Sequence, residues 1–514
     1  MTASTLPPPG RLSARLLLAI GCMAYAPPLC ATDYFLTIGG GYDPTGNQAS
    51  LEANVQFFQQ VLAEKHRGPR RHDIFFADGH DPAADLEIVA EQPARINAPA
   101  TDLLASLHRR RGEIEVAYRN HRVNGIAGPL DPALIRADLE ALAKVARRGD
   151  RLIVYVTAHG SEGPEDDLFD TTIDCWNERE ITAREFSTWL TRLPSEVPVV
   201  MVMAQCYCGG FAHTIFQDLD EAKGLAPQLR VGFFAQQHDL PAAGCRPDIE
   251  HDEEFSSYFW GALAGRSRNG VAIEGCDIDG NGVVSFAEAH AYAVTAGETI
   301  DIPLRASEVL LRAYSRLAAE ETREAESKPA LATMSGPLQG FVDRGGPVAG
   351  RTVTQLARTL GFALQDDVSA VLKADEDHRR ADRSRSRERG PRQGSGRREL
   401  LRQVAEKWPE LGDPRRWEKS PLLRPDNQQP LLAELKQLPG WMEYDRRVRE
   451  REAASLESER QELRDVKHRR LINALEVIVL EQNLPLLATP KIVERYRQMV
   501  ALEESTLNPG ASRR

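Results

Sequence analysis

The sequence predicts an α/β protein built on a mostly parallel β-sheet, followed by an α-helical C-terminal region. Residues 152–157 and 197–203 are short apolar runs, rich in β-branched residues and without alternation, which is typical of strands buried on both faces of a parallel sheet. Helical patterns separate the strand patterns between residues 33 and 264, which indicates β-α-β units with right-handed crossovers. We therefore expect a doubly wound sheet of about five or six strands with helices on both faces.

Length and charge narrow the class of protein. With 514 residues the chain is too long for one ordinary core, so more than one domain is expected. The formal net charge of -11 argues against a general phosphate-binding surface and therefore against a nucleic-acid partner.

Residues 1–31 have the pattern of a signal peptide. Two arginines precede an apolar run at residues 16–24, and small residues ending at Ala31 form an acceptable cleavage site. The run is too short to span a bilayer. We expect an exported protein, periplasmic or extracellular. The alternatives are lipidation at Cys22 and an uncleaved segment that anchors the protein; once the signal is cleaved after Ala31, no membrane contact is expected.

The number of cysteines leaves room for a free thiol, and hence a thiol nucleophile, even in an oxidising compartment. Beyond the signal there are five cysteines, an odd number that leaves at least one thiol free or paired between chains. A structural disulfide among the others stays open. These cysteines are Cys175, Cys206, Cys208, Cys245 and Cys276.

The elements follow one another in α/β order. A strand at 33–38 is followed by three glycines and then by a helix at 49–64. The glycines do not predict a phosphate loop, because no G-K-[ST] follows them. We expect instead a loop that passes close to a neighbouring site. Residues 80–129 are polar and predict an irregular excursion. The remaining expected elements are a strand at 73–77, a helix capped by Asp131-Pro132, a helix at 182–193, a strand at 230–235 and helices at 252–264 and 302–320.

Each of the two buried strands delivers a reactive side chain at its carboxyl end, where parallel sheets bind ligands. The first leads to His159-Gly160 and the second to Cys206. An imidazole beside a thiol promotes thiolate formation and can later protonate a leaving amine. Because Gly160 has no Cβ, its N–H and that of Cys206 are candidates for an oxyanion hole. A buried structural cysteine with an uninvolved histidine is the simpler alternative.

These motifs resemble the caspase and legumain group of cysteine peptidases, clan CD, over about Thr32 to Leu317. Cys206 follows His159 by 47 residues, close to the roughly 50 typical of caspases. The resemblance implies a caspase-like α/β/α sandwich as the catalytic domain, residues 32–320. It also implies peptide-bond hydrolysis through a thioester, with His159 as general acid, Cys206 as nucleophile and the amides of Gly160 and Cys206 as the oxyanion hole.

Some positions depart from both families. Gln205 directly precedes the cysteine, and Gly46-Asn47-Gln48 stands where legumains have an Arg-His pair, so the P1 preference stays open and the chain looks nearer to bacterial legumain-like peptidases. Cys208 is expected as a neutral residue lining the turn, with a redox partner of Cys206 or an alternative nucleophile as the other interpretations.

A second motif, residues 277–288, matches an EF-hand loop. Oxygen ligands at this spacing suit a hard cation, and we expect a structural Ca²⁺ that holds the following helix beside the sheet. Residues 266–275 do not predict an entering helix, so the motif is half an EF-hand. The expected ligands are Asp277, Asp279, Asn281, Val283, Ser285 and Glu288.

The C-terminal part changes character. Residues 321–399 predict a charged linker, in which Lys373 to Glu399 are expected to be disordered, and residues 400–514 a helical region with a long helix at 441–480. This helix could fold as a hairpin, mediate self-association or mask the active site. Two alternatives to an endopeptidase acting on peptides or proteins remain: a transpeptidase or ligase with the same dyad, and a non-catalytic calcium-binding interaction protein.

Overall fold

The computed structural model describes residues 31–90, 98–108, 116–244, 254–317, 331–388 and 395–508. The predicted signal peptide up to residue 30, with Cys22, lies outside the described residues, and so does Cys245. Within the described ranges, no helix combines the length and apolar character that a membrane span requires.

The centre of the molecule is a six-stranded sheet in the order β10-β9-β8-β5-β1-β2. Five strands are parallel, and the short edge strand β10 pairs antiparallel with β9. Every residue of β5, β8 and β9 is buried, as their continuous apolar runs predict. The mostly parallel α/β sheet is thus confirmed. Its strands are β1 (Asp33–Gly40), β2 (Arg70–Phe76), β5 (Arg151–Ala158), β8 (Val199–Met203), β9 (Arg230–Phe234) and β10 (Leu304–Arg305).

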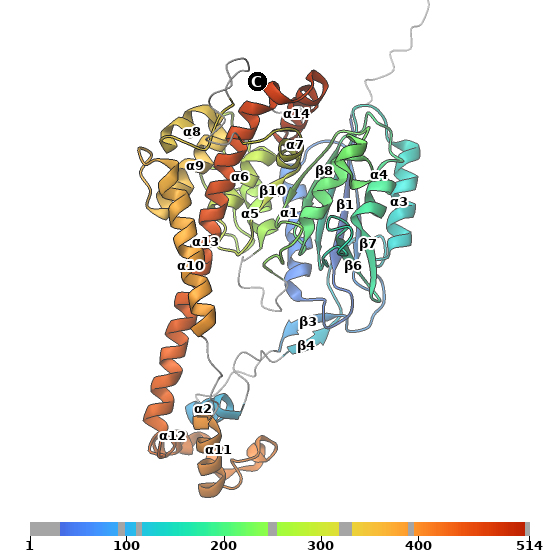
Figure 1. Ribbon diagram of the computed structural model, residues 1–514. Coiled ribbons are helices and arrows are strands. Elements are labelled where there is room, and N and C mark those ends of the chain that lie inside the picture. The colour runs from blue at the N-terminus through green and yellow to red at the C-terminus, as the bar shows by residue number, and fades with distance from the viewer. Residues whose placement is uncertain are drawn as a thin grey trace, which may run out of the picture.

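Helices cover both faces of this sheet (Figure 1). On one side lie α1 (Ala49–Lys65), α5 (Phe255–Ala264) and α6 (Phe286–Ala296), and on the other α3 (Pro132–Val145) and α4 (Ala183–Leu190). Helix α7 (Ala306–Tyr314) directly follows the edge strand β10. It starts later than the predicted helix at 302–320, because β10 occupies Leu304 and Arg305. Together the layers are consistent with an α/β/α sandwich.

Side-chain caps fix where two of these helices start. The carboxylate of Asp131 accepts hydrogen bonds from the N–H groups of Ala133 and Leu134, with Pro132 at the first helical position, as the sequence predicts. Thr182 and Glu185 form a reciprocal capping box at the start of α4.

The excursion between β2 and α3 is more ordered than its polar composition suggests. It contains the hairpin β3 (Leu86–Val89) and β4 (Val116–Arg119) and the helix α2 (Pro99–His108). Leu104 and Leu107 of α2 are buried in an apolar cluster with residues of the C-terminal region. Sequence alone does not reveal this partner because it lies about 300 residues away in the chain.

The predicted charged linker, residues 321–399, is helical over most of its described part, including residues 373–388 of the stretch expected to be disordered. Residues 331–388 contain α8 (Leu338–Arg344), α9 (Gly346–Leu360) and α10 (Val368–Glu388). Apolar side chains at helical spacing, among them Val353, Leu356 and Val371, are fully buried against α13. The high charge is carried by the remaining faces of these helices, and it concealed the apolar stripe.

The C-terminal region is helical, as predicted, and its long helix extends from Trp441 to Leu487. The second half of this helix, α13, packs against α7, α9 and α10, whereas its first half projects from the sheet domain toward α2 (Figure 1). The other helices are α11 (Ser395–Lys407), α12 (Gln428–Lys436) and α14 (Pro490–Glu503).

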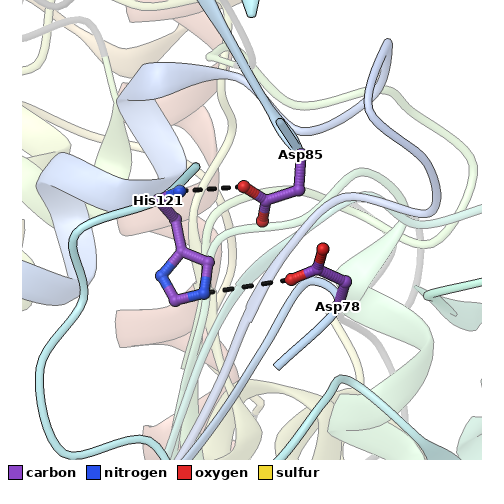
Figure 2. A group of neighbouring side chains, drawn as sticks. All are labelled: Asp78, Asp85 and His121. Atoms are coloured by element: carbon purple, nitrogen blue, oxygen red, sulfur yellow. Dashed lines mark hydrogen bonds and ion pairs between the residues drawn. The ribbon is translucent and has the colours of Figure 1, made fainter. Parts of the chain in front are cut away.

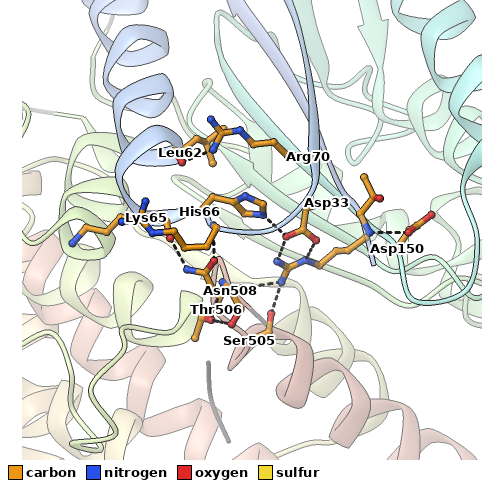
Figure 3. A network of polar contacts seen from close by, with 12 residues as sticks. Asp33, Leu62, Lys65, His66, Arg70, Asp150, Ser505, Thr506 and Asn508 are labelled. Atoms are coloured by element: carbon orange, nitrogen blue, oxygen red, sulfur yellow. Dashed lines mark hydrogen bonds and ion pairs between the residues drawn. The ribbon is translucent and has the colours of Figure 1, made fainter. Parts of the chain in front are cut away.

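Residues 505–508, which follow α14, contact the sheet at the N-terminal ends of β1 and β5 (Figure 3). Arg151 forms a buried ion pair with Asp33, with Nη2 2.8 Å from Oδ2. Its Nη1 donates to Ser505 Oγ at 3.0 Å and to the carbonyl of Thr506 at 3.1 Å. The side chain of Asn508 accepts from the N–H of Arg67 at 2.8 Å. We call residues 505–508 with Asp33 and Arg151 the C-terminal clasp.

Candidate active site

The strand register places His159 and Cys206 at the same level of the sheet. In the parallel pair β5 and β8, Val156 is the partner of Met203. Each candidate side chain follows its strand partner by three residues, and neighbouring strands lie about 4.8 Å apart. The structure therefore brings the two turns together, as the sequence analysis predicts from their positions.

Gly160 is the point of closest approach between these turns. A Cβ atom at this position would lie 2.6 Å from the carbonyl oxygen of Cys206 and 2.6 Å from that of Thr172. Both are backbone atoms that cannot rotate away. Only glycine fits between them, so the residue after His159 packs directly against the backbone of the proposed nucleophile.

The loop between β1 and α1 fixes the tautomer of His159. Its Nε2 lies 2.7 Å from the carbonyl oxygen of Gly46 and 3.0 Å from Gln48 Oε1. The Gln48 amide is oriented by its own donation to the carbonyl of Thr45. Because a carbonyl oxygen can only accept, Nε2 carries the proton and Nδ1 keeps its lone pair. The ring of Tyr42 packs edge-on, with centroids 5.2 Å apart.

The thiol of Cys206 is half-buried and is held by the loop after β9. The N–H of Ala242 donates to Sγ at 3.3 Å, and the next N–H, of Ala243, donates to Asp301 Oδ1 at 2.7 Å. Among the described residues, no hydrogen bond joins this thiol to the imidazole of His159. Catalytic hydrogen bonds often tighten only when substrate binds, so this geometry is compatible with an acid-base pair without substrate.

Burial favours the uncharged forms of both Cys206 and His159. Burial raises the pKa of the Cys206 thiol, and the carboxylates of Asp301 and Asp174 raise it further, while the N–H of Ala242 lowers it. Burial lowers the pKa of His159. Near pH 7 the site thus contains a thiol and a neutral imidazole, and the imidazole is in the form that can accept a proton.

Two backbone N–H groups remain for an oxyanion. Among the described residues, neither the N–H of Gly160 nor that of Cys206 donates to a backbone carbonyl of another residue. The chain turns sharply after the thiol, since Tyr207 has φ of 58° and adopts the left-handed conformation that is uncommon for a non-glycine residue. Such strain is common where a fold must present a reactive side chain.

Cys208 is a structural residue of this turn. It is fully buried at the start of the 3₁₀ helix η1 (Cys208–Ile215), and its Sγ accepts from the N–H of Gln236 at 3.3 Å. Burial strongly raises the pKa of its thiol. All four described cysteines, this one and Cys175, Cys206 and Cys276, are free thiols.

The EF-hand-like loop gathers its acidic residues. Carboxylate oxygens of Asp277, Asp279 and Glu288 lie within 4.8 Å of one another. Gly282 has φ of +87° at the sharp turn. Ser285 caps α6 in a reciprocal box with Glu288, and residues 266–276 before the loop are not helical, in line with half an EF-hand.

The donor set of this loop fits a hard cation. Oxygen atoms, which hard cations such as Ca²⁺ prefer, are available from the side chains of Asp277, Asp279, Asn281 and Glu288 and from the carbonyl of Val283. Glu288, though almost fully buried, keeps its carboxylate beside the N–H groups of Ile278 and Asp279. The helix that follows packs on the sheet, where Phe286 meets Phe233 with ring centroids 6.2 Å apart.

Several residues of the site were not predicted as functional. Gly46 and Gln48, which hold His159, could have been inferred, because the loop after β1 ends beside the neighbouring strand β5. By contrast, Ala242 and Asp301 reach the site from separate loops and Asp174 from the short strand β6 (Thr172–Cys175), and no pattern around them signals a role.

Comparisons with known proteins leave the family open. No family model matches the chain, and no curated protein matches it. Among solved structures, the chain has a weak likeness to the crystal structure of a protein from Geobacter sulfurreducens, with 12% identity and a TM-score of 0.26. That alignment covers 45% of this chain and 80% of the other.

Proposed function

We propose that this chain is an exported cysteine endopeptidase whose residues 32–320 form a caspase-like or legumain-like catalytic domain. The observation that carries the proposal is the juxtaposition of His159 and Cys206 at equivalent ends of adjacent parallel strands, with Gly160 packed on the backbone of Cys206. A purely structural cysteine has no need of an oriented histidine and unused N–H groups beside it.

In the proposed reaction, Nδ1 of His159 accepts the proton of the thiol while Sγ attacks the scissile carbonyl carbon. The resulting oxyanion accepts hydrogen bonds from the N–H groups of Gly160 and Cys206. His159 then protonates the leaving amine, the C–N bond breaks and a thioester remains on Cys206. Water, deprotonated by the same imidazole, hydrolyses the thioester and restores the thiol.

The proposal assigns a structural Ca²⁺ to residues 277–288. Asp277, Asp279, Asn281, Val283, Ser285 and Glu288 would hold it, and when bound it supplies positive charge that neutralises the clustered carboxylates. The role of these residues is to fix the start of α6, which packs against β9 of the sheet.

An electrophilic peptide probe tests the enzyme proposal. Full-length protein with calcium and a reductant is treated with a peptidyl acyloxymethyl ketone, and the modified residue is identified by mass spectrometry. We expect labelling at Cys206, its loss in Cys206→Ala and its retention in the matched control Cys208→Ala. An unlabelled wild-type protein, or equal labelling of Cys206→Ala, would refute a thiol enzyme and favour the interaction protein.

A peptide library then separates hydrolysis from transfer. Cleaved products with free carboxylates indicate an endopeptidase, whereas new amide bonds to an added amine indicate a transpeptidase or ligase. Sequencing the products also defines the P1 residue.

A further inference from the structure

Figure 2 shows a second group of titratable side chains, formed by Asp78, Asp85 and His121. Asp78 follows β2, Asp85 precedes β3 and His121 follows β4, and their ligand atoms lie within 4.8 Å of one another. Asp85 is 1% exposed, and the Oδ1 atom of Asp78 is buried with no hydrogen-bond partner.

The tautomer of His121 argues against a metal ion here. Its Nδ1 accepts from the N–H of Val123 at 3.3 Å, so the proton sits on Nε2, which donates to the carbonyl of Gly79 at 2.8 Å. Nε2 therefore has no lone pair to give to a cation, although it lies only 4.0 Å from Asp78 Oδ1. Two carboxylates this close repel each other in a buried site, and a single proton held by the pair removes that repulsion.

Asp85 is connected to the loop of residues 41–48 through Asn47, which is fully buried. Asn47 Nδ2 donates to the carbonyl of Asp85 at 2.9 Å and to its Oδ2 at 3.3 Å. The other end of the same amide, Oδ1, accepts from the N–H of Gly41 at 3.1 Å. One buried side chain thus ties the loop's first residue to the carboxyl pair, while the neighbouring Gly46 and Gln48 contact His159.

We propose that Asp78 and Asp85 form a one-proton carboxyl pair that positions His159 through Asn47 and the loop of residues 41–48. The inference rests on the proposed function, in which His159 is the acid-base group. Asp85, as carboxylate, accepts from the N–H of His121 at 2.8 Å and from Asn47. When Asp78 loses the proton, a second charge appears beside Asp85, and the repulsion loosens the contact with Asn47 and hence the imidazole.

The surroundings of the pair are consistent with this proton. Burial, followed by the charge of Asp85, raises the pKa of Asp78 to about 6. The groups that act on the pair are His121 and, from the β2–β3 turn, Asp81. Two further carboxylates nearby are bound elsewhere. Glu52 of α1 accepts a hydrogen bond from Arg119, and Glu87 of β3 accepts one from the hydroxyl of Tyr118.

The test follows His159 directly, whether or not the chain cleaves peptides. The full chain is labelled with ¹⁵N and ¹³C histidine, the His159 signals are assigned by their loss in His159→Gln, and the imidazole shifts are recorded between pH 4.5 and 9. In the wild type we expect a second inflection near pH 6 besides the one from the ring's own titration. Asp78→Asn, a neutral isostere of the protonated acid, should abolish that inflection and keep the Nε2–H tautomer. Asp81→Asn, which removes an exposed carboxylate that raises the pKa of Asp78, should move the inflection to lower pH without abolishing it.

Activity adds an independent measurement. We expect Asp85→Asn, which loses the carboxylate held by Asn47 and His121, to reduce kcat/KM about tenfold or more, with the larger part in kcat. Asp78→Asn should keep activity at pH 6 and lose less of it than the wild type up to pH 8.

Two outcomes would overturn the proposal. One is a His159 titration that is identical in the wild type and Asp78→Asn. The other is calorimetric binding of Ca²⁺ or Zn²⁺ that Asp78→Asn abolishes and Asp277→Asn does not, which would make the group a metal site. If no peptidase activity is found at all, the proposed function fails, while the histidine shifts still report on the pair.

Discussion

The contact between Gly160 and the backbone of Cys206 gives a sharp prediction for Gly160→Ala. The added Cβ would lie 2.6 Å from two carbonyl oxygens, those of Cys206 and Thr172, and 2.8 Å from Gln205 Cγ. The side chain of Gln205 can move, but the two carbonyls cannot without moving their strands. Relief to a normal contact requires a backbone shift of roughly half to one ångström.

The effects on stability and on activity should differ in size. Overpacking of this kind costs about 1–3 kcal/mol of the free energy of unfolding. A displacement near 1 Å between nucleophile and base costs about 100-fold in rate. We therefore expect a folded variant in which kcat falls by about two orders of magnitude and KM changes little.

Urea denaturation and steady-state kinetics on a peptide substrate measure these two quantities. The matched control is Gly340→Ala in α8, where a Cβ meets no atom within 4 Å, and where alanine should be neutral or stabilise the helix by up to about 1 kcal/mol. If Gly160→Ala keeps both the wild-type stability and the wild-type kcat, the close packing of the two turns is not what orders the site. Should the wild type cleave no peptide, the stability measurement still tests the contact.

Three further predictions concern the thiol, the metal loop and the C-terminal clasp. Because burial raises the pKa of Cys206 above its usual 9.0, the rate of its alkylation by iodoacetamide should still rise with pH up to about 9; a plateau near pH 7 would indicate a preformed thiolate. Calcium should raise Tm and EDTA should reverse this, with the effect absent in Asp277→Asn and Glu288→Gln, whereas an equal shift in those variants would place the ion elsewhere. Asp33→Asn leaves Arg151 buried without its ion-pair partner and should lower the free energy of unfolding, measured by urea denaturation, by about 3–5 kcal/mol. The control Asp218→Asn removes an exposed pair with Lys223 and should lower it by at most about 1 kcal/mol. Similar losses in both variants would contradict the assigned role of the clasp.

The parts of the fold that could be predicted are those with a local signal. The runs before His159 and Cys206 are continuous and β-branched, so their burial in a parallel sheet followed from sequence, and so did the proximity of the two turns that follow them. The glycine after His159 was likewise recognisable, because its position beside a reactive group suggests a close approach.

The parts that could not be predicted depend on partners far away in the chain. Val353 and Leu356 are core residues only because α13 lies beside them, and the surrounding charge suggested a linker instead. Asp301 affects Cys206 through a loop about 95 residues further along the chain, and no local pattern distinguishes it from other acidic loop residues. The pairing of Asp78 with Asp85 is equally invisible, since it depends on how the β2–β3 turn folds against the segment after β4.

The C-terminal clasp has a consequence for the order in which the protein is made. Arg151 sits on the central strand β5, and its buried hydrogen bonds are completed only by Ser505 and Thr506. Because synthesis proceeds from the N-terminus, the sheet can pair its strands long before those residues have left the ribosome, but it cannot satisfy this edge. This edge is complete only when residues 505 and 506 reach Arg151, and a sheet that assembles without them carries a buried arginine lacking two of its four side-chain hydrogen bonds.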